Sequence, residues 1–256
     1  MGRAAGLSTE QLIMRGPDAA PPSVTEALRV LTARRVRREP MAYILGEREF
    51  WGLAFKVTPA VLVPRPDSET LIEAVLELLP DRNRALRILD LGVGSGCLLL
   101  TLLKQFPGST GIGFDASAEA LAVTRSNAET LGVAGRTSLV EGDWRQAGWA
   151  DRLDGRFDLV VSNPPYIESS AIGGLMPEVA RFEPPLALDG GADGLTAYRI
   201  IAAAAPKLVT RGGFLAVEAG EGQSAEIARL LAAASLVPKA PKKDLGGIER
   251  VVAAAY

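Results

Sequence analysis

The segment S-N-P-P-Y, residues 162–166, follows the apolar run FDLVVS and ends a predicted strand with an amide, two prolines and a phenol. Pro164 and Pro165 fix their own φ angles and have no backbone N–H, so this corner is stiff and poor in donors. The side-chain oxygen of Asn163 and the backbone carbonyl of Pro164 are two acceptors for the N–H bonds of a planar –NH2 group. Tyr166 can lie flat against that group. We therefore expect these four residues to be catalytic and to position a planar nitrogen.

A glycine-rich loop in ILDLGVGSGCLLL follows an earlier predicted strand and precedes a helix. Glycines here let the backbone turn tightly and approach a nucleotide-like ligand. In a dinucleotide site two residues separate the third glycine from the second, whereas only Ser95 separates Gly94 from Gly96 here. The spacing favours the amino-acid end of S-adenosylmethionine, and a purely structural turn is the alternative. The residues of this loop expected to hold the cofactor are Asp90, Gly92, Val93, Gly94, Ser95 and Gly96.

Acidic and aromatic residues end the next two predicted strands. Asp115 can accept hydrogen bonds from both ribose hydroxyls of the cofactor. Its alternative role is the N-cap of the following helix, which Ser117 could also fill. Asp143 can accept from the adenine amino group, and Trp144 can stack on the ring or wall its pocket, with a core position as the alternative. Asn163 is expected at the same edge of the sheet and in the same cofactor pocket.

The composition excludes several kinds of chemistry. The chain of 256 residues has no histidine, which excludes Ser-His-Asp and Cys-His nucleophiles, and its one cysteine, Cys97, leaves no zinc site. We therefore expect no metal. A well-positioned nitrogen beside a reactive sulfonium needs no strong base, which fits a chain without histidine. A net charge of −2 gives no reason to expect a nucleic-acid substrate. One cysteine, no secretory signal and no membrane-spanning run together predict a cytoplasmic protein.

From residue 86 onward, predicted strands and helices alternate, which indicates a mostly parallel α/β sheet covered on both faces. The predicted strands are 86–92, 110–115, 137–143, 157–163, 212–220 and 250–256. The predicted helices are 96–105, 117–131, 193–209 and 221–234.

Two short helices are expected near the N-terminus. Ser8 with Gln11, and Ser23 with Glu26, have the spacing of capping boxes. The basic run at residues 34–38 is interpreted as a solvated helix end, which the helix dipole favours, and a docking patch for an acidic partner is the alternative.

Extended pieces around Gly46 and Gly52 predict a hairpin that leads to the main domain, which opens with a helix over residues 67–79. The predicted units are a short helical N-terminal region at 1–40, a hairpin linker at 41–66 and a catalytic domain at 67–256.

DLGVGSG together with NPPY resembles the class I S-adenosylmethionine-dependent methyltransferases that act on planar amino nitrogens. EPMAYILGEREFWGLAFKVTPAVLVPRPDSETLIE, NPPYIE, RFEPPLALDGGADGL, GGFLAVEAG and LGGIERVV resemble the HemK-type protein-(glutamine-N5) methyltransferases, from about Glu39 to the C-terminus. The resemblance implies a Rossmann-like seven-stranded sheet. It also implies methylation of the glutamine amide in the Gly-Gly-Gln motif of peptide-chain release factors, with S-adenosylhomocysteine as product.

The resemblance also assigns residues. It places Gly92 to Gly96, Asp115, Trp144 and Asn163 at the cofactor, and residues 163–166 around the glutamine. Two loops would line the mouth of the site, with structural ion pairs as their alternative: Arg65, Pro66 and Glu69, and Arg181, Phe182 and Glu183.

Two departures from the family pattern are visible. Val93 stands where the family usually carries threonine, so a hydroxyl facing the cofactor is lost and a lower affinity is expected. The region before Glu39 is short beside the family's helical N-terminal domain.

Three other functions compete with this reading. The same corner would suit glutamine methylation of a ribosomal protein, or adenine-N6 methylation of nucleic acid, which the balanced charge disfavours. A non-catalytic binder of a translation factor is of a different class, and the intact glycine loop and Asn163 argue against it.

Overall fold

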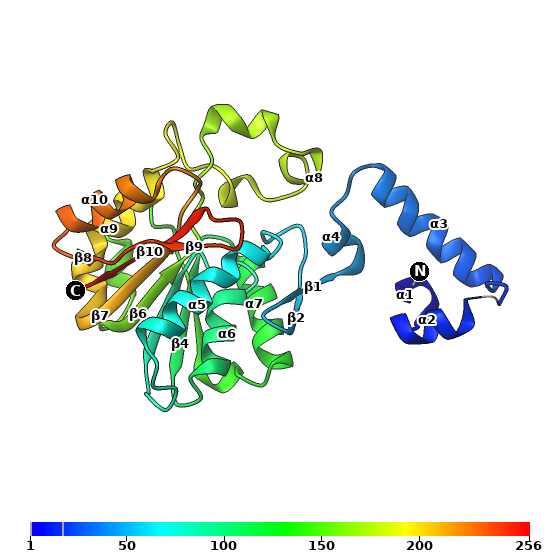
Figure 1. The fold of residues 1–256 in the computed structure, drawn as a ribbon, viewed down its shortest axis with the longest axis horizontal. Helices are drawn as coiled ribbons and strands as arrows, with labels where there is room; N and C mark the ends of the chain where they lie inside the picture. The colour runs from blue at the N-terminus through cyan, green and yellow to red at the C-terminus, as the bar shows by residue number, and fades with distance from the viewer. Residues whose placement is uncertain (1, 17) are drawn as a thin grey trace.

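The computed structural model describes residues 2–16 and 18–256 (Figure 1), so Met1 and Pro17 of the predicted N-terminal region lie outside the described residues. The α-helices are α1 (Gly2–Ala5), α2 (Thr9–Arg15), α3 (Pro22–Val36), α4 (Met41–Leu45), α5 (Glu69–Leu78), α6 (Cys97–Gln105), α7 (Ala118–Thr130), α8 (Pro177–Ala180), α9 (Thr196–Leu208) and α10 (Ser224–Ala233). Short 3-10 turns are η1 (Pro66–Ser68), η2 (Ala134–Arg136), η3 (Trp149–Arg152), η4 (Ser169–Gly174) and η5 (Pro185–Ala187).

The strands form a hairpin and one large mixed sheet. They are β1 (Glu47–Phe50), β2 (Leu53–Lys56), β3 (Arg87–Leu91), β4 (Thr110–Asp115), β5 (Thr137–Glu141), β6 (Phe157–Ser162), β7 (Val209–Glu218), β8 (Val237–Pro238), β9 (Lys242–Lys243) and β10 (Glu249–Ala255). The described part of the large sheet has the order β5-β4-β3-β6-β7-β10-β8, with β9 also paired to β10. β8 and β9 pair with successive parts of β10 and share one edge position. The predicted seven-stranded sheet is therefore confirmed, with β10 antiparallel to β7.

Helices cover both faces of this sheet (Figure 1). Side chains alternate between faces along a strand, and the consecutive residues Ile88 and Leu89 of β3 belong to opposite core clusters. The cluster around Ile88 is closed by α5, α6 and part of α7, and the hairpin adds Phe50 and Phe55 to it. The cluster around Leu89 is closed by α9, α10 and η3. Three layers therefore hold the carboxyl ends of the parallel strands at one edge.

The N-terminal helices α1, α2 and α3 stand away from the sheet, and α4 and the hairpin lie between them and it (Figure 1). The capping box of Ser8 and Gln11 is confirmed. The one predicted for Ser23 is wrong, because the helix already begins at Pro22, and proline suits the first helical position. The stretch Met41–Leu45, predicted as extended, is a short helix that Gly46 ends with a φ of 79°.

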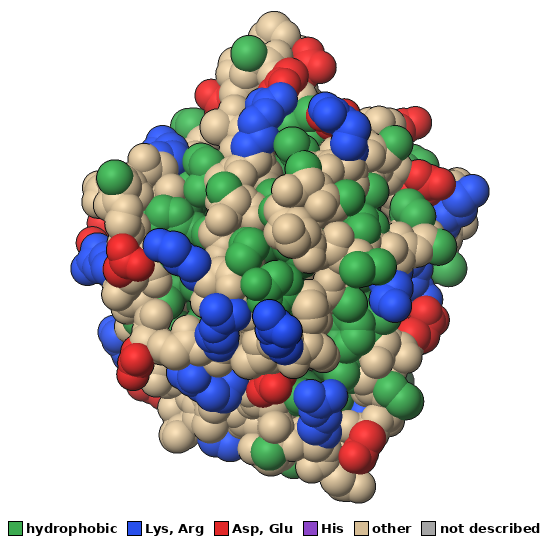
Figure 2. Space-filling model, turned by 90° about the vertical axis from the view of Figure 1, so that its left-hand side faces the viewer, with side chains coloured by type: hydrophobic (Ala, Val, Ile, Leu, Met, Phe, Trp, Pro, Cys, Tyr) green, Lys and Arg blue, Asp and Glu red, His purple; other side chains and the backbone are tan. Residues whose placement is uncertain are grey.

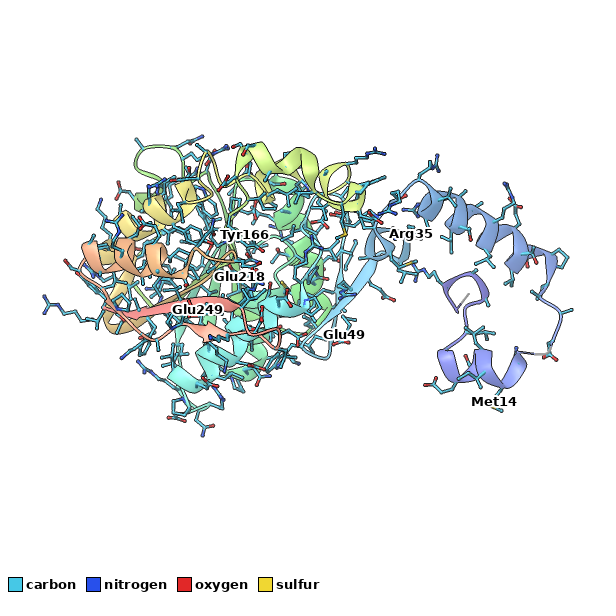
Figure 3. The ribbon with its side chains drawn as sticks, turned by 45° about the horizontal axis from the view of Figure 1, so that its top comes forward. Met14, Arg35, Glu49, Tyr166, Glu218 and Glu249 are labelled. Atoms are coloured by element: carbon cyan, nitrogen blue, oxygen red, sulfur yellow. The ribbon has the colours of Figure 1, made fainter. Side chains whose placement is uncertain are left out.

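The basic run at the end of α3 is not simply solvated. Arg34 forms an ion pair with Glu39. Arg35 and Arg38 both pair with Glu178 of α8, at 2.9 and 2.7 Å. Figure 3 shows Arg35 at the junction between α3 and the rest of the molecule. These pairs join the N-terminal helices to the loop region above the sheet, which corrects the prediction of a purely solvated helix end.

Figure 2 shows the end of the molecule that carries α10 and β8, where Lys and Arg side chains are spread among apolar ones. Lys242 and Lys243 form the short edge strand β9, and charged side chains on an edge oppose pairing with another sheet. None of the helices in the described ranges has the length and hydropathy needed to cross a bilayer.

Candidate active site

The ligand crevice lies where the strand order reverses, between β3 and β6. These parallel neighbours pair Leu91 with Ser162, and the Ser162 hydroxyl donates to the Leu91 carbonyl at 2.7 Å. The glycine loop leaves β3, and the N-P-P-Y corner leaves β6, at the same edge. Open α/β sheets bind ligands at this kind of switch point.

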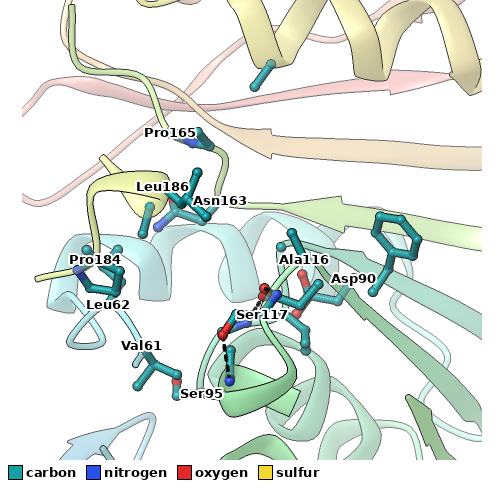
Figure 4. Close-up of a pocket in the computed structure, with 18 of the residues that line it drawn as sticks. Val61, Leu62, Asp90, Ser95, Ala116, Ser117, Asn163, Pro165, Pro184 and Leu186 are labelled. Carbon is teal, nitrogen blue, oxygen red and sulfur yellow. Dashed lines mark hydrogen bonds between the residues drawn. The ribbon is translucent and has the colours of Figure 1, made fainter. Parts of the chain in front are cut away.

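A cavity of about 620 Å³ opens between the two segments, a size typical of small-molecule sites (Figure 4). Most of the predicted site residues line it: Asp90, Gly92, Val93, Gly94, Ser95, Asp115, Asp143, Trp144, Asn163 and Pro165. The lining described does not include the predicted residues Gly96, Pro164 and Tyr166.

The glycine loop is tied to the end of β4. The backbone N–H groups of Gly92 and Val93 donate to the Phe114 carbonyl at 2.8 and 3.1 Å. Gly92 has a φ of 75°, and a Cβ there would lie 3.1 Å from the Trp144 ring. Only glycine combines this conformation with this close approach, so the loop forms a cradle beside Trp144.

Asp115 holds the loop and faces the cavity. Its Oδ2 accepts from the Gly94 N–H and its Oδ1 from the Ser117 N–H, both at 2.9 Å. Ser117 itself caps α7 by accepting from the Ala120 N–H, so Asp115 is not the side-chain cap of that helix. Burial raises the pKa of Asp115. Each carboxylate oxygen keeps a second lone pair that can accept from a ribose hydroxyl.

Asp90 and Val93 lie at the floor of the cavity. The Asp90 Oδ2 accepts from the Leu99 N–H at 3.2 Å, while its Oδ1 is buried without a hydrogen-bond partner among the described residues. Burial raises the pKa of Asp90 to about 7. An orphaned buried oxygen at a cavity wall suits a ligand donor, such as the amino group of S-adenosylmethionine. Val93 is buried and packs on Gly113, so its side chain is also part of the core.

Asp143 and Trp144 also line the cavity. Arg145 holds the Asp143 carboxylate at 2.6 Å and lowers its pKa. Trp144 lines the cavity and also packs against the core cluster beneath α9. Trp144 therefore walls the cavity and also packs in the core, which are the two roles that the sequence left open. Asp143 is ionised, as an acceptor for an adenine amino group should be, but part of its acceptor capacity is used by Arg145.

The N-P-P-Y corner presents Asn163 to the cavity (Figure 4). Its Nδ2 donates to the Ser68 Oγ at 3.1 Å, which leaves Oδ1 as the acceptor. The Tyr166 hydroxyl lies 3.4 Å from Oε1 of Glu218. The backbone carbonyl of Tyr166 accepts a hydrogen bond from the side-chain amide of Gln223. Tyr166 thus supports the corner from behind in this structure. A Cβ on Gly190 would lie 2.8 Å from the Tyr166 Cα, so the following loop packs tightly on the corner.

Two residues of this corner were not predicted from the sequence. Ser68 and Glu218 come from η1 and from the end of β7, and both are buried. Glu218 carries a signal that could have been used, because it is an acid at the carboxyl end of a buried strand in FLAVEAG. Ser68 carries no such signal, since only the fold brings it to Asn163.

The mouth of the cavity is held by an ion pair. Arg65 pairs with Glu183 at 2.7 Å and joins the two loops predicted to line the mouth. Glu69 accepts from the Trp51 N–H, and Phe182 packs on the cluster that contains Tyr43. Arg65 therefore lines the cavity, as predicted for this loop, and also forms the structural ion pair given as the alternative, with Glu183. Glu69 forms a structural hydrogen bond instead.

Replacing Arg65 with alanine should destabilise the fold in a pH-dependent way. Glu183 is only 2% exposed, while Arg65 is 33% exposed, so we expect a loss of about 2–3 kcal/mol, below the range for fully buried pairs. Burial already raises the pKa of Glu183, and Arg65→Ala should raise it further. The loss in free energy of unfolding is then smallest below the ordinary pKa of a glutamate carboxyl. It grows as the pH rises through the raised pKa of Glu183 in the folded variant.

Urea unfolding between pH 4 and pH 8 measures this effect. The double variant Arg65→Ala/Glu183→Gln is the matched control, because it has no buried charge and should regain most of the stability. A loss that is independent of pH, or unchanged in the double variant, would show that the charge of Glu183 is not its cause.

The sheet order and the cavity at its switch point place the chain in the class of S-adenosylmethionine-dependent methyltransferases. A family model described as the methyltransferase small domain matches residues 66–177, and one described as the PrmC N-terminal domain matches residues 1–46. The chain belongs to the release factor glutamine methyltransferase family.

The similarity to individual proteins extends over nearly the whole chain. The release factor glutamine methyltransferase of Rhodospirillum rubrum is 47% identical over 253 residues, which cover 99% of this chain and 76% of that protein. The protein of the same description from Bradyrhizobium diazoefficiens is 46% identical over 257 residues, covering 99% and 85%. A solved methyltransferase structure from Pyrococcus furiosus has the same fold, with a TM-score of 0.58 at 17% identity, covering 90% of this chain and 98% of that one.

Proposed function

We propose that this chain transfers a methyl group from S-adenosylmethionine to the side-chain amide nitrogen of the glutamine in the Gly-Gly-Gln motif of peptide-chain release factors. The relatives from Rhodospirillum rubrum and Bradyrhizobium diazoefficiens are release factor glutamine methyltransferases. The observation that supports it best in the structure is the Asn163 amide, turned by Ser68 so that its oxygen is available as an acceptor at the cavity.

The residues present fit the cofactor. A Cβ at Gly92 would press against the Trp144 ring, Asp115 lines the cavity and keeps free lone pairs, and the buried Oδ1 of Asp90 has no protein partner among the described residues. We assign the ribose hydroxyls to Asp115, the amino-acid end to the glycine loop with Asp90, and the adenine side to Asp143 and Trp144. When bound, the cofactor supplies a methyl group on an electrophilic sulfonium.

The N-P-P-Y corner positions the nucleophile. In the proposed complex, Asn163 Oδ1 and the Pro164 carbonyl accept the two N–H bonds of the substrate amide, so its nitrogen faces the methyl donor. Pro164 and Pro165 bring no N–H that would compete for those acceptors. Positioning of this kind lowers the activation barrier, because the reactants have already lost their translational and rotational freedom on binding. As the new N–C bond forms, the amide nitrogen loses one proton to solvent or to a nearby carboxylate, which leaves a neutral N-methyl amide.

A cytoplasmic location is part of this proposal, because release factors act during translation. The free Cys97 is half-buried and lines the cavity, and its pKa is raised to about 12 mainly by desolvation; an unpaired cysteine is compatible with a reducing compartment.

The choice of substrate is tested by supplying labelled S-adenosylmethionine with a release factor, a ribosomal large-subunit protein or duplex DNA in separate reactions. We expect label on the release factor at a rate at least tenfold above the other two. Label that appears first on the ribosomal protein or on DNA would replace the proposed substrate with that one.

A further inference from the structure

The N-P-P-Y corner is fixed at its start by the sheet. Ser162, the last residue of β6, pairs with Leu91 of β3, and its hydroxyl donates to the Leu91 carbonyl at 2.7 Å. The corner itself cannot extend this pairing, because Pro164 and Pro165 have no backbone N–H. Its position at the cavity therefore depends on what holds its other end, at Tyr166.

The other end of the corner is held by Gln223, in the turn between β7 and α10. The Gln223 Nε2 donates to the Tyr166 carbonyl at 3.0 Å, and its Oε1 accepts from the Gly220 N–H at 3.1 Å. A side-chain amide has one donor group and one acceptor group, and only this orientation satisfies both partners. Gln223 therefore joins the corner to the turn that follows the neighbouring strand β7.

Two glycines make room for this contact. A Cβ on Gly194 would lie 2.4 Å from the Tyr166 carbonyl oxygen and 2.5 Å from Gln223 Nε2. A Cβ on Gly220 would lie 2.6 Å from Gln223 Oε1 and 3.1 Å from Cδ2 of the Tyr166 ring. A side chain at either position would displace the hydrogen-bonded groups, so the close approach requires glycine. The loop before α9 and the turn before α10 thus both pack against the Tyr166 end of the corner.

The contact at Tyr166 lies next to the residues that face the cavity. Asn163 and Pro165 line the cavity, and Tyr166 follows them directly. Because each proline of the corner fixes its own φ, a displacement of Tyr166 is passed on to these residues rather than absorbed between them. The chain after the corner is anchored separately, at Ile167, by backbone hydrogen bonds to the loop before α9. The bond from Gln223 therefore acts on the corner itself.

We propose that Gln223 is a positioning residue for methyl transfer, which holds the Tyr166 carbonyl so that the N-P-P-Y corner presents its acceptors to the substrate amide in one position. This inference rests on the proposed function. It assigns a role to a side chain outside the described cavity lining, which acts on the substrate only through the corner.

Loss of the contact should slow the chemical step and leave cofactor binding intact. Transfer requires the substrate nitrogen to be aligned with the methyl donor, and a misplacement of about 1 Å can cost about 100-fold in rate. The residues that we assign to the cofactor follow β3, β4 and β5, whereas the hydrogen bonds of the Gln223 side chain go to Tyr166 and Gly220. A fall in kcat without a change in cofactor affinity is therefore the expected result.

The variants Gln223→Met and Gln223→Glu together test this role. Met removes both hydrogen bonds without adding charge. Glu keeps the shape of the side chain and the acceptor for the Gly220 N–H, but an ionised carboxylate at pH 8 cannot donate. The loss that the two variants share is the donor to Tyr166. We expect kcat for release-factor methylation to fall about 10- to 100-fold in both, with the Kd for S-adenosylmethionine within threefold of wild type.

A role of Gln223 confined to the turn before α10 would instead leave Gln223→Glu with wild-type kcat, because that variant keeps the contact with Gly220. Gln105→Met is the matched control for the loss of a side-chain amide. Gln105 is a half-buried glutamine at the last position of α6, away from the corner, and its variant should keep wild-type kcat.

A second route to the same contact keeps the test decisive if the Gln223 variants fold poorly. Gly194→Ala would place its Cβ against both atoms of the hydrogen bond, and it should lower kcat to a similar extent with the Kd for S-adenosylmethionine again within threefold. Gly132→Ala is the matched control, because Gly132 has a φ of 70° against 71° at Gly194, with open space where a Cβ would stand. It has the same backbone strain without touching the corner, so it should keep wild-type kcat.

The outcomes separate this inference from the proposed function. Wild-type kcat in Gln223→Met or Gln223→Glu would overturn the inference. A rise in the Kd for S-adenosylmethionine that matches the fall in kcat would also overturn it, because the contact would then act on the whole site rather than on the corner. A wild-type protein that leaves the release factor unlabelled would contradict the proposed function instead.

Discussion

Asn163→Ala should lose methyl transfer by about 10²–10³-fold while its affinity for S-adenosylmethionine changes only a few-fold. The variant removes a preorganised acceptor at the reacting nitrogen, and losses of this size follow when one such group is removed from an active site. Its Nδ2 is held by Ser68 in the wild type, so Oδ1 needs no reorganisation before the reaction. The contacts that we propose for the cofactor come mainly from the glycine loop and Asp115, which the substitution leaves in place.

Single-turnover rates with saturating cofactor, together with calorimetric titration of S-adenosylmethionine, separate the two effects. Asn83→Ala is a matched control, because Asn83 is an exposed asparagine in the loop before β3, at the opposite edge of the sheet. It should behave as wild type. If Asn163→Ala keeps a rate within threefold of wild type, the two-acceptor account of the corner is wrong.

Asp115→Ala should weaken S-adenosylmethionine binding by about 100-fold or more. Two effects contribute. The variant loses the acceptors proposed for the ribose hydroxyls, and hydrogen bonds to a charged group are worth about 1.5–3 kcal/mol each. It also releases the Gly94 and Ser117 N–H groups, which hold the glycine loop against the start of α7. Turnover at saturating cofactor should recover substantially, because the corner that holds the amide is untouched.

Calorimetry of the wild type and the variant measures this directly. Asp154→Ala, a change at an exposed aspartate in the loop before β6, is the matched control and should bind like wild type. An Asp115→Ala protein that binds within threefold of wild type would remove Asp115 from the cofactor site. Absence of binding in the wild type itself would favour the non-catalytic binder over the enzyme.

The chemistry-bearing edge of the fold could be predicted because its signals are local. The β3, β4 and β6 strands end within a residue or two of the predicted positions, and the residues after them meet at the cavity. Parallel strands bring their carboxyl ends to one edge whatever lies between them in sequence. Asp90, Asp115 and Asn163 could therefore be assigned to one site before any distance was known.

Contacts between distant segments could not be predicted in this way. Ser68 and Asn163 are 95 residues apart, and Arg38 and Glu178 are 140 apart. No sequence periodicity links such pairs, since their members meet only in the folded chain. The local errors have a different origin: Pro22 competed with Ser23 for the helix start.

The pKa of Glu218 is another property that depends on contacts between distant segments. The position of this residue at a strand end could be predicted, but the groups that shift its pKa come from η1, the N-P-P-Y corner and β10. The sequence pattern marks where an acid stands, while its pKa depends on what the fold packs around it.

The central claim is that this chain methylates a glutamine amide nitrogen of a release factor, and mass spectrometry of the product tests it most directly. A release factor incubated with the protein and S-adenosylmethionine should gain a single methyl group on the side-chain nitrogen of the glutamine in its Gly-Gly-Gln motif. A factor with that glutamine changed to alanine should gain none. A methyl group at any other residue, or one that persists in the alanine variant, would contradict the account.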